Sequence, residues 1–158
     1  PANRPSVGSG PARTLGLTKN QTTDLRMTDL LDSFYSALRA LSATDLADCV
    51  SEDFVLDWQG TESIPWAGRW HGVPGLLDFV TLLNTNLEIL EVQRLHTLVQ
   101  ESVAVVVIKG HWRVKRTSIE VRATAANLFT FAAGKIQSYT VLNNTAAFLE
   151  ALSTSQSV

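Results

Sequence analysis

The sequence has almost no cysteine and no long apolar run. Cys49 is the only cysteine among 158 residues, so an intrachain disulfide is impossible. It lies in an apolar helical stretch, which indicates a small core residue rather than a nucleophile. The longest apolar run, Val103 to Ile108, is far shorter than the ~18 residues that a membrane-spanning helix needs. We therefore expect no disulfide and no membrane partner.

Neither sign of charge dominates the composition. Thirteen Lys and Arg stand against fifteen Asp and Glu, which leaves a formal charge of −2. A nucleic-acid-binding protein would normally carry a basic stripe, and an electrostatic membrane anchor would carry a basic cluster. We therefore expect no nucleic acid as a partner. Because the N-terminus lacks the apolar segment of a secretory signal, we expect a cytoplasmic protein.

Motifs for metals and nucleotide cofactors are also lacking. The three histidines and one cysteine have no ligand spacing. There is no P-loop and no Gly-rich dinucleotide turn. The segment Gly134-Lys135-Ile136 joins two expected strands, which indicates a hairpin turn rather than a phosphate loop. We therefore expect neither a metal nor a cofactor.

The chain does have enough apolar residues, 45%, to build one core. Residues 1–27 hold three of the five prolines and bury too little apolar surface to offset the entropy of ordering, so we expect a flexible tail there. Residues 28–152 form the expected domain, and residues 153–158 a short C-terminal tail.

The hydrophobic periodicity predicts helices followed by strands. Thr28 is a suitable N-cap for a first helix, whose apolar face ends near Leu41. We expect further helices over 43–50, 76–87 and 145–152, a loop over 59–70, and strands over 54–58, 90–99, 103–114, 119–131 and 136–142. This order predicts an α+β fold with helices on one face of a mostly antiparallel sheet.

The long strand over 103–114 has two distinct faces. Its apolar positions fit a core-facing row, and its polar positions fit the outer face. The predicted inner row is Val106, Ile108, Gly110, Trp112 and Val114; the predicted outer row is Lys109, His111, Arg113 and Lys115.

Three local patterns resemble one known family. The first is Phe34 to Leu38 leading to the acidic turn at 51–55. The second is the loop Pro65-Trp66-Ala67-Gly68-Arg69-Trp70-His71-Gly72. The third is the hairpin of 127–131 and 134–139 followed by Asn144-Thr145-Ala146. Their order and spacing resemble the NTF2-like superfamily, in its SnoaL-like and ketosteroid-isomerase-like branch.

The resemblance implies a cone-shaped fold with about three N-terminal helices, a short C-terminal helix and one deep apolar pocket. It also implies a homodimer that forms through the outer face of the sheet. The ligand-binding pocket implied for this chain is lined by Phe34, Trp58, Trp66, Ile108, Trp112, Asn127, Phe129, Tyr139 and Val141. Such an aromatic pocket suits a small, flat, apolar ligand.

The catalytic carboxylates of the family are not found at the matching positions. Ketosteroid isomerase needs an Asp base and an oxyanion hole of Tyr and protonated Asp. The matching positions here are Trp58 for the base and Phe34 and Asn127 for the oxyanion hole. Trp58 cannot take a carbon-bound proton and Phe34 has no hydroxyl, whereas Asn127 can still donate a hydrogen bond to an oxygen. The matching positions of limonene-epoxide hydrolases, Ile108, Gly110 and Val141, have no acid or base.

Two other residues are candidates for a base. Asp57 is adjacent to Trp58, but strand side chains alternate faces, so it would point outward unless a β-bulge reverses it. His71 lies in the loop at the expected mouth of the cone; His111 and His96 are weaker candidates. The catalytic candidates are therefore Asn127, His71 and Asp57. For each of them the alternative is a purely structural role without catalysis.

These observations leave three hypotheses for the function. The first is a cofactor-independent isomerase, cyclase, dehydratase or hydrolase that acts on a polyketide, terpenoid or steroid-like compound. The second is a protein that binds such a small molecule without catalysis. The third is a dimerisation or interaction module that uses the outer sheet face, with Thr124, Leu128, Thr130 and His111 at the contact.

Overall fold

The computed structural model describes residues 16–154, which contain four helices and six strands. None of the helices in this range has the length and hydrophobicity to cross a membrane. In chain order the elements are α1 (Lys19–Ala40), α2 (Ala43–Cys49), β1 (Val50–Trp58), β2 (Gly68–His71), α3 (Gly72–Asn86), β3 (Leu87–Gln100), β4 (Val103–Val114), β5 (Glu120–Ala132), β6 (Lys135–Leu142) and α4 (Thr145–Ser153).

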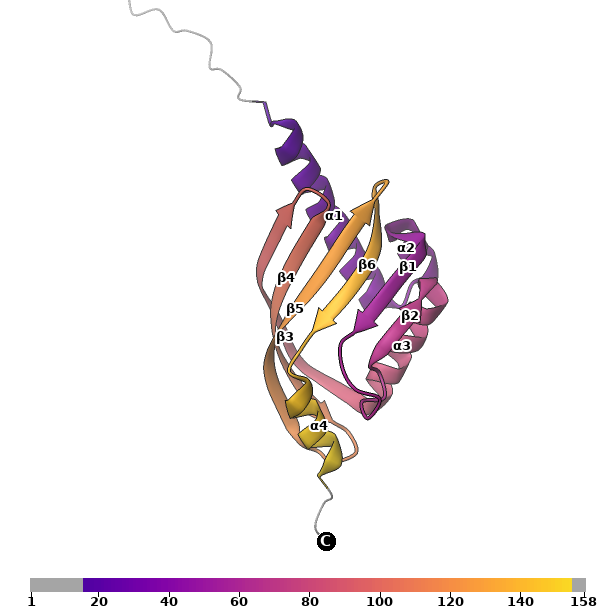
Figure 1. Ribbon diagram of the computed structural model, residues 1–158, viewed down its shortest axis with the longest axis vertical. Coiled ribbons are helices and arrows are strands. Elements are labelled where there is room, and N and C mark those ends of the chain that lie inside the picture. Colours follow the sequence, from indigo (N-terminus) through magenta and orange to yellow (C-terminus); the bar gives the residue numbers. More distant parts are fainter. Residues whose placement is uncertain (1–15, 155–158) are drawn as a thin grey trace, which may run out of the picture.

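All six strands join in one open sheet with the order β2-β1-β6-β5-β4-β3. Strands β1 and β6 run parallel, and every other neighbouring pair is antiparallel. The sheet curves, helices α1, α2 and α3 lie on one side of it, and α4 lies at the end opposite the start of α1 (Figure 1). The predicted α+β class, with a mostly antiparallel sheet and a C-terminal helix, is confirmed.

Helix α1 begins earlier than the sequence pattern predicts. Thr18 is its N-cap, and the Thr18 hydroxyl and the Gln21 side chain each accept a backbone N–H from the other residue, at 3.3 and 3.0 Å. This capping box satisfies donors of the first turn. The prediction that Thr28 caps the helix is therefore wrong, because Thr28 lies inside it and donates its hydroxyl to the Asp24 carbonyl. Part of the expected tail 1–27 is thus helical, whereas residues 1–15 and 155–158 lie outside the described range.

One strand was missing from the prediction. The segment 59–70 was expected to be a loop, but β2 pairs with β1 in antiparallel register, with Asp57 opposite Arg69 and Trp58 opposite Gly68. A strand of four residues gives too short a pattern to recognise. Helix α3 also begins at Gly72 rather than at Leu76, because Pro74 is compatible with a first helical turn, where its missing N–H leaves no bond unmade.

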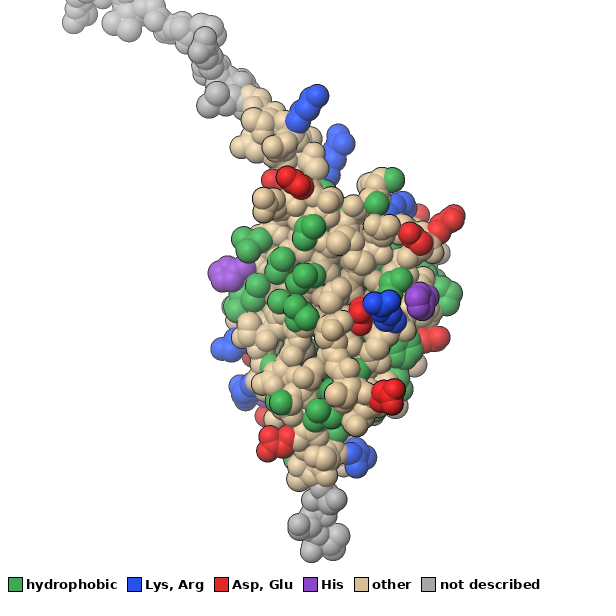
Figure 2. Space-filling view, viewed as in Figure 1, with side chains coloured by type: hydrophobic (Ala, Val, Ile, Leu, Met, Phe, Trp, Pro, Cys, Tyr) green, Lys and Arg blue, Asp and Glu red, His purple; other side chains and the backbone are tan. Residues whose placement is uncertain are grey.

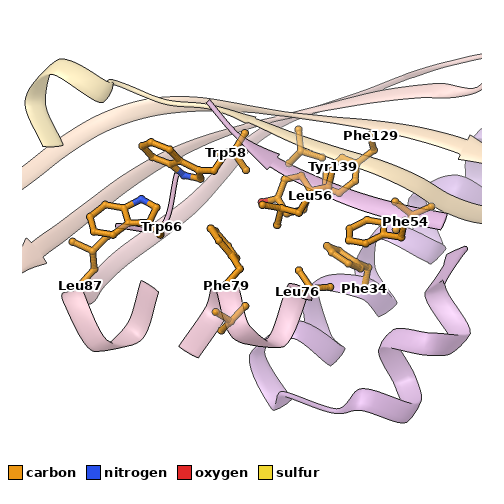
Figure 3. Packing of buried hydrophobic residues seen from close by; sticks show 14 of the residues in the cluster. Phe34, Phe54, Leu56, Trp58, Trp66, Leu76, Phe79, Leu87, Phe129 and Tyr139 are labelled. Carbon is orange, nitrogen blue, oxygen red and sulfur yellow. The ribbon is translucent and has the colours of Figure 1, made fainter. Parts of the chain in front are cut away.

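The core contains two groups of aromatic rings (Figure 3). Ring contacts with centroid distances of 4.5–6.3 Å connect the members of each group. The tryptophan group consists of Trp58, Trp66, Trp112 and Phe148. The tyrosine group consists of Phe34, Tyr35, Phe54, Phe129 and Tyr139. In Figure 3 Trp58 and Trp66 lie at one end of the core, and Phe34, Phe54, Phe129 and Tyr139 at the other.

Glycines make room for two of the tryptophans. A Cβ at Gly110 would overlap the Trp112 ring, which shares the inner face of β4 two residues away. A Cβ at Gly60 would lie 2.7 Å from the Trp58 ring. The missing side chains therefore let both indole rings lie across the inner surface of the sheet, where they shape the space beneath the helices.

We expect Phe34→Ala to destabilise the fold strongly. The ring is 0% exposed and contacts four aromatic rings of the tyrosine group. Loss of a buried phenyl ring with a cavity left behind costs about 3–5 kcal/mol of unfolding free energy. Denaturant unfolding measures this, with Leu25→Ala as the control, since Leu25 is 51% exposed on α1 and should change stability by less than ~0.5 kcal/mol. A loss for Phe34→Ala as small as that of the control would contradict this packing.

We expect Gly110→Ala to displace the Trp112 ring. The new methyl group takes the place of the indole, and overpacking of this kind costs about 1–3 kcal/mol of unfolding free energy. Gly110→Ala should cost much less unfolding free energy in the Trp112→Leu variant than in the wild type, because the smaller side chain leaves room for the methyl group. Denaturant unfolding of the four proteins in this cycle measures the coupling. Additive effects would show that the ring does not lie over Gly110.

Candidate functional site

A cavity of about 280 Å³ lies between the inner face of the sheet and the helices. The four members of the tryptophan group line it, and Tyr35, Asn127 and Tyr139 line it on the side of the tyrosine group. Its exposed lining residues are Arg39 at the end of α1 and Ile89 and Val92 on β3, and they mark where the cavity reaches the surface. The walls between are aliphatic, and include Leu83, Leu87, Ile108, Ala125 and Val141.

Strand register explains why distant residues share this cavity. Trp58 on β1 is opposite Val141 on β6, and Val141 is opposite Asn127 on β5. Residues opposite each other in a sheet point to the same face. The three side chains therefore form one inward row across three strands, about 4.8 Å apart from strand to strand. Ile108 and Trp112 on β4 belong to the same inner face, as the alternation of β4 predicted.

The structure places most of the predicted pocket residues around the cavity. Those that line it are Trp58, Trp66, Ile108, Trp112, Asn127, Tyr139 and Val141. Phe34 and Phe129 do not line it. Both rings are fully buried in the tyrosine group, where Phe129 stacks on Tyr139 at 4.5 Å between ring centroids. They support the cavity wall from behind.

The polar residues that line the cavity are Arg39, Asn143 and a cluster of Asn127, Tyr35 and Tyr139. Asn127 Nδ2 donates a hydrogen bond to Tyr35 Oη at 2.9 Å, and Tyr139 lines the same cavity. Burial raises the pKa of Tyr35 above its ordinary value of 10.0 and raises that of Tyr139 well above it. Both phenols therefore stay protonated and uncharged at neutral pH.

Tyr35 is a lining residue that the sequence pattern does not single out. The family resemblance matches the helix-1 tyrosine position to Phe34, one residue earlier, which has no hydroxyl. On a helix, residue 35 lies four residues after Leu31 and three before Leu38, so it shares their apolar face. That spacing was a readable signal. The Arg94 guanidinium lies 5.0 Å from the centre of the Tyr35 ring and pairs with Asp32 at 2.7 Å, which holds this part of α1 against β3.

Two buried polar atoms of the lining have no hydrogen-bond partner in the described part of the chain. They are Trp66 Nε1 and Asn127 Oδ1. Trp66 is 0% exposed and Asn127 is 2% exposed. Buried polar groups are nearly always paired, so such atoms at a cavity indicate where a bound molecule would make its polar contacts.

The structure does not bring Asp57 or His71 to the cavity. Asp57 follows the strand alternation and points away from Trp58, and its carboxylate pairs with Arg69 on β2 at 3.4 Å. His71 is exposed at the end of β2 and makes no side-chain cap for α3. His111 lies on the outer face of β4, where Nε2 is 2.6 Å from Glu120 Oε2. Of the three predicted catalytic residues, only Asn127 lines the cavity.

The chemistry available in the cavity is therefore neutral hydrogen bonding. Among the described residues that line it there is no Asp, Glu, His or Cys. The ionisable groups are Tyr35 and Tyr139, which stay protonated, and the guanidinium of Arg39. These groups can orient a ligand and polarise its oxygen atoms, but none of them can accept a proton near neutral pH.

Solved structures with a similar fold have low sequence identity to this chain. An NTF2-like protein from Burkholderia xenovorans LB400 is 20% identical with a TM-score of 0.76, over 82% of this chain and 97% of that one. TerC, co-crystallised with polyporic acid, is 14% identical with a TM-score of 0.70, over 82% and 99%. A proposed SnoaL-like polyketide cyclase from Jannaschia sp. CCS1 is 13% identical with a TM-score of 0.68, over 84% and 94%. At these identities the likeness shows the fold alone.

A comparison with curated proteins finds no match. The family model of the SnoaL-like domain matches residues 31–139, which is more than half of the chain. The matched range runs from α1 to β6 and includes most of the residues that line the cavity. The chain therefore belongs to the family of SnoaL-like domains, and its fold is similar to that of a solved NTF2-like protein.

Proposed function

We propose that this protein binds a small, flat, mostly apolar molecule of the polyketide, terpenoid or steroid-like type in its cavity. The observation that carries the proposal is the combination of tryptophan walls with one buried polar cluster, Asn127–Tyr35–Tyr139. Binding sites for small molecules typically have mostly apolar walls and a few placed polar groups. The cavity of about 280 Å³ suits a molecule of two or three fused rings.

The apolar walls provide the main driving force for such binding. A fused ring system that buries about 150 Å² of apolar surface gains roughly 4 kcal/mol at ~25 cal/mol per Å². Flat rings also pack well against indole faces. The polar cluster then fixes the orientation, because a ligand oxygen that reaches it exchanges water for buried hydrogen bonds.

Two proteins with a similar fold support this class of ligand. TerC was co-crystallised with polyporic acid, and the protein from Jannaschia sp. is a proposed polyketide cyclase. Both have folds similar to that of this chain, and we extend the ligand class to it on that basis together with the aromatic walls of the cavity.

A second candidate function is a cofactor-independent isomerase, cyclase, dehydratase or hydrolase. The observation that favours it is the protonated Tyr35 hydroxyl beside Asn127, since such groups stabilise negative charge that develops on a substrate oxygen. Because the described lining contains no general base, the base in such a reaction would be water or a group of the substrate itself.

Tryptophan fluorescence tests the binding proposal. Titration with polycyclic ketones, quinones including polyporic acid, and steroid ketones should give saturable changes for at least one compound. We expect Trp112→Ala to weaken that binding about tenfold or more, because it removes a large part of one wall. His71→Ala, outside the cavity, is the matched control and should bind like the wild type.

The pH dependence of binding tests the neutral character of the site. Because the pKa values of Tyr35 and Tyr139 are raised from 10.0, both phenols keep their protons, and affinity for an uncharged ligand should stay constant between about pH 6 and 9. A step in affinity near pH 6.5 would indicate a histidine in the site and contradict a neutral site.

The same titrations separate the two candidate functions. Reaction product in the titration mixture would favour the second candidate. Equal binding by wild type and Trp112→Ala would place the ligand outside the cavity.

We also propose a homodimer that forms through the outer face of the sheet. Leu98 is opposite Val105, Val105 is opposite Leu128, and Leu128 is opposite Thr140, so these side chains form one outer row across four strands. Leu98 is 64% exposed, and Val103 beside it is 41% exposed. Figure 2 shows hydrophobic side chains gathered on this face. Contiguous exposed apolar surface of this kind is typical of a protein interface.

Light scattering coupled to size exclusion tests the dimer. The wild type should elute as a dimer at micromolar concentration, and Leu128→Lys should shift it to the monomer, because a charge in the row would be buried without a partner. The exposed residue Leu25, on α1 and outside the sheet, provides the control Leu25→Lys. A monomeric wild type, or a dimer unchanged by Leu128→Lys, would contradict this interface.

A further inference from the structure

The two unpaired polar atoms of the cavity differ in what they can bind. An indole nitrogen is a donor only, so Trp66 Nε1 needs an acceptor. The Asn127 amide already donates through Nδ2 to Tyr35, and its unpaired atom, Oδ1, can only accept. A single molecule that satisfies both must therefore have an acceptor in one place and a donor in another.

The two atoms belong to different ends of the cavity. Trp66 lies between β1 and β2 in the tryptophan group, where its ring makes edge contacts with Trp58 and Phe148 at 5.9 and 5.8 Å. Its indole nitrogen is on the side of the ring that faces Trp58 (Figure 3). Asn127 is attached to the tyrosine group through its hydrogen bond to Tyr35. The inward row Trp58–Val141–Asn127 runs across β1, β6 and β5 from the tryptophan group to Asn127.

We propose, as a refinement that rests on the proposed function, that the ligand is a flat hydroxy-carbonyl compound, whose carbonyl oxygen accepts from Trp66 Nε1 and whose hydroxyl donates to Asn127 Oδ1. Each contact pairs an atom that is otherwise buried without a partner. The tryptophan and aliphatic walls cover the ring system between the two groups.

The same geometry specifies the charge state of that hydroxyl. An ionised phenol or carboxylate would place its negative oxygen against Asn127 Oδ1, which is itself an acceptor. Removal of such a charge from water is costly without a buried cation. The site therefore selects a neutral hydroxyl compound over its anion and over a carboxylic acid.

Four related ring compounds test the proposal by calorimetry. An acetylnaphthol with its two groups on opposite edges of the ring system has both the carbonyl and the hydroxyl. Acetylnaphthalene has only the carbonyl, naphthol only the hydroxyl, and naphthalene neither. For the wild type, each polar group should improve the affinity about tenfold, since each pairs one buried atom. His71→Ala, at an exposed position outside the cavity, should show the same two preferences.

Two variants assign each preference to one residue. Trp66→Phe keeps an aromatic ring but removes the donor. Ligands with and without the carbonyl should then bind with about equal affinity, while the preference for ligands with the hydroxyl remains. Asn127→Leu keeps the size but removes the acceptor, so the opposite pattern is expected. Because each result is a ratio between two ligands on one protein, a general loss of stability or of cavity shape affects both and cancels.

The outcomes separate this inference from the proposed function. If all four compounds bind the wild type equally, or if the variants keep both preferences, the polar contacts are wrong although the cavity still binds flat molecules. If none of the four binds, both the inference and the proposed ligand class are overturned. Selective loss of the carbonyl preference in Trp66→Phe and of the hydroxyl preference in Asn127→Leu is the result that the structure predicts.

Discussion

The hydrogen bond from Asn127 Nδ2 to Tyr35 Oη joins the middle of the sheet to helix α1 across the interior. It forms between a strand and a helix that are far apart in sequence, and it gives the amide nitrogen of Asn127, a residue that is 2% exposed, an acceptor in the partly buried Tyr35 hydroxyl. Because the bond uses the amide nitrogen, the amide oxygen has no partner in the described part of the chain. This contact sets the polarity of one end of the cavity, whereas burial keeps both Tyr35 and Tyr139 protonated.

Around this contact the protein divides its aromatic residues between two tasks. The tyrosine group closes one end of the core, with Phe34 and Phe129 packed behind the residues that line the cavity. The tryptophan group forms the walls at the other end, where Gly60 and Gly110 leave room for the indole rings. The result is a space with aromatic walls and one polar cluster, which is suited to holding a flat molecule and orienting it by hydrogen bonds.

The sequence predicted much of the fold because long periodic segments carry clear signals. The alternation of β4 correctly placed Ile108 and Trp112 inward and His111 outward, and the same alternation correctly placed Asp57 on the face opposite Trp58. It did not reveal β2, which is too short for a pattern, or the start of α1, where the capping box at Thr18 and Gln21 precedes the apolar face. Tyr35 was missed because a helix rotates by about 100° per residue, so a shift of one position changes which side chain faces the cavity.

If the cavity itself holds the ligand through neutral polar contacts, a crystal structure of the protein with acetylnaphthol should show electron density between the tryptophan walls and Tyr35. The carbonyl oxygen should lie within hydrogen-bond distance of Trp66 Nε1, and the hydroxyl within that distance of Asn127 Oδ1. Density for the compound only on the outer sheet face, with the cavity empty at saturating concentration, would rule out binding in the cavity.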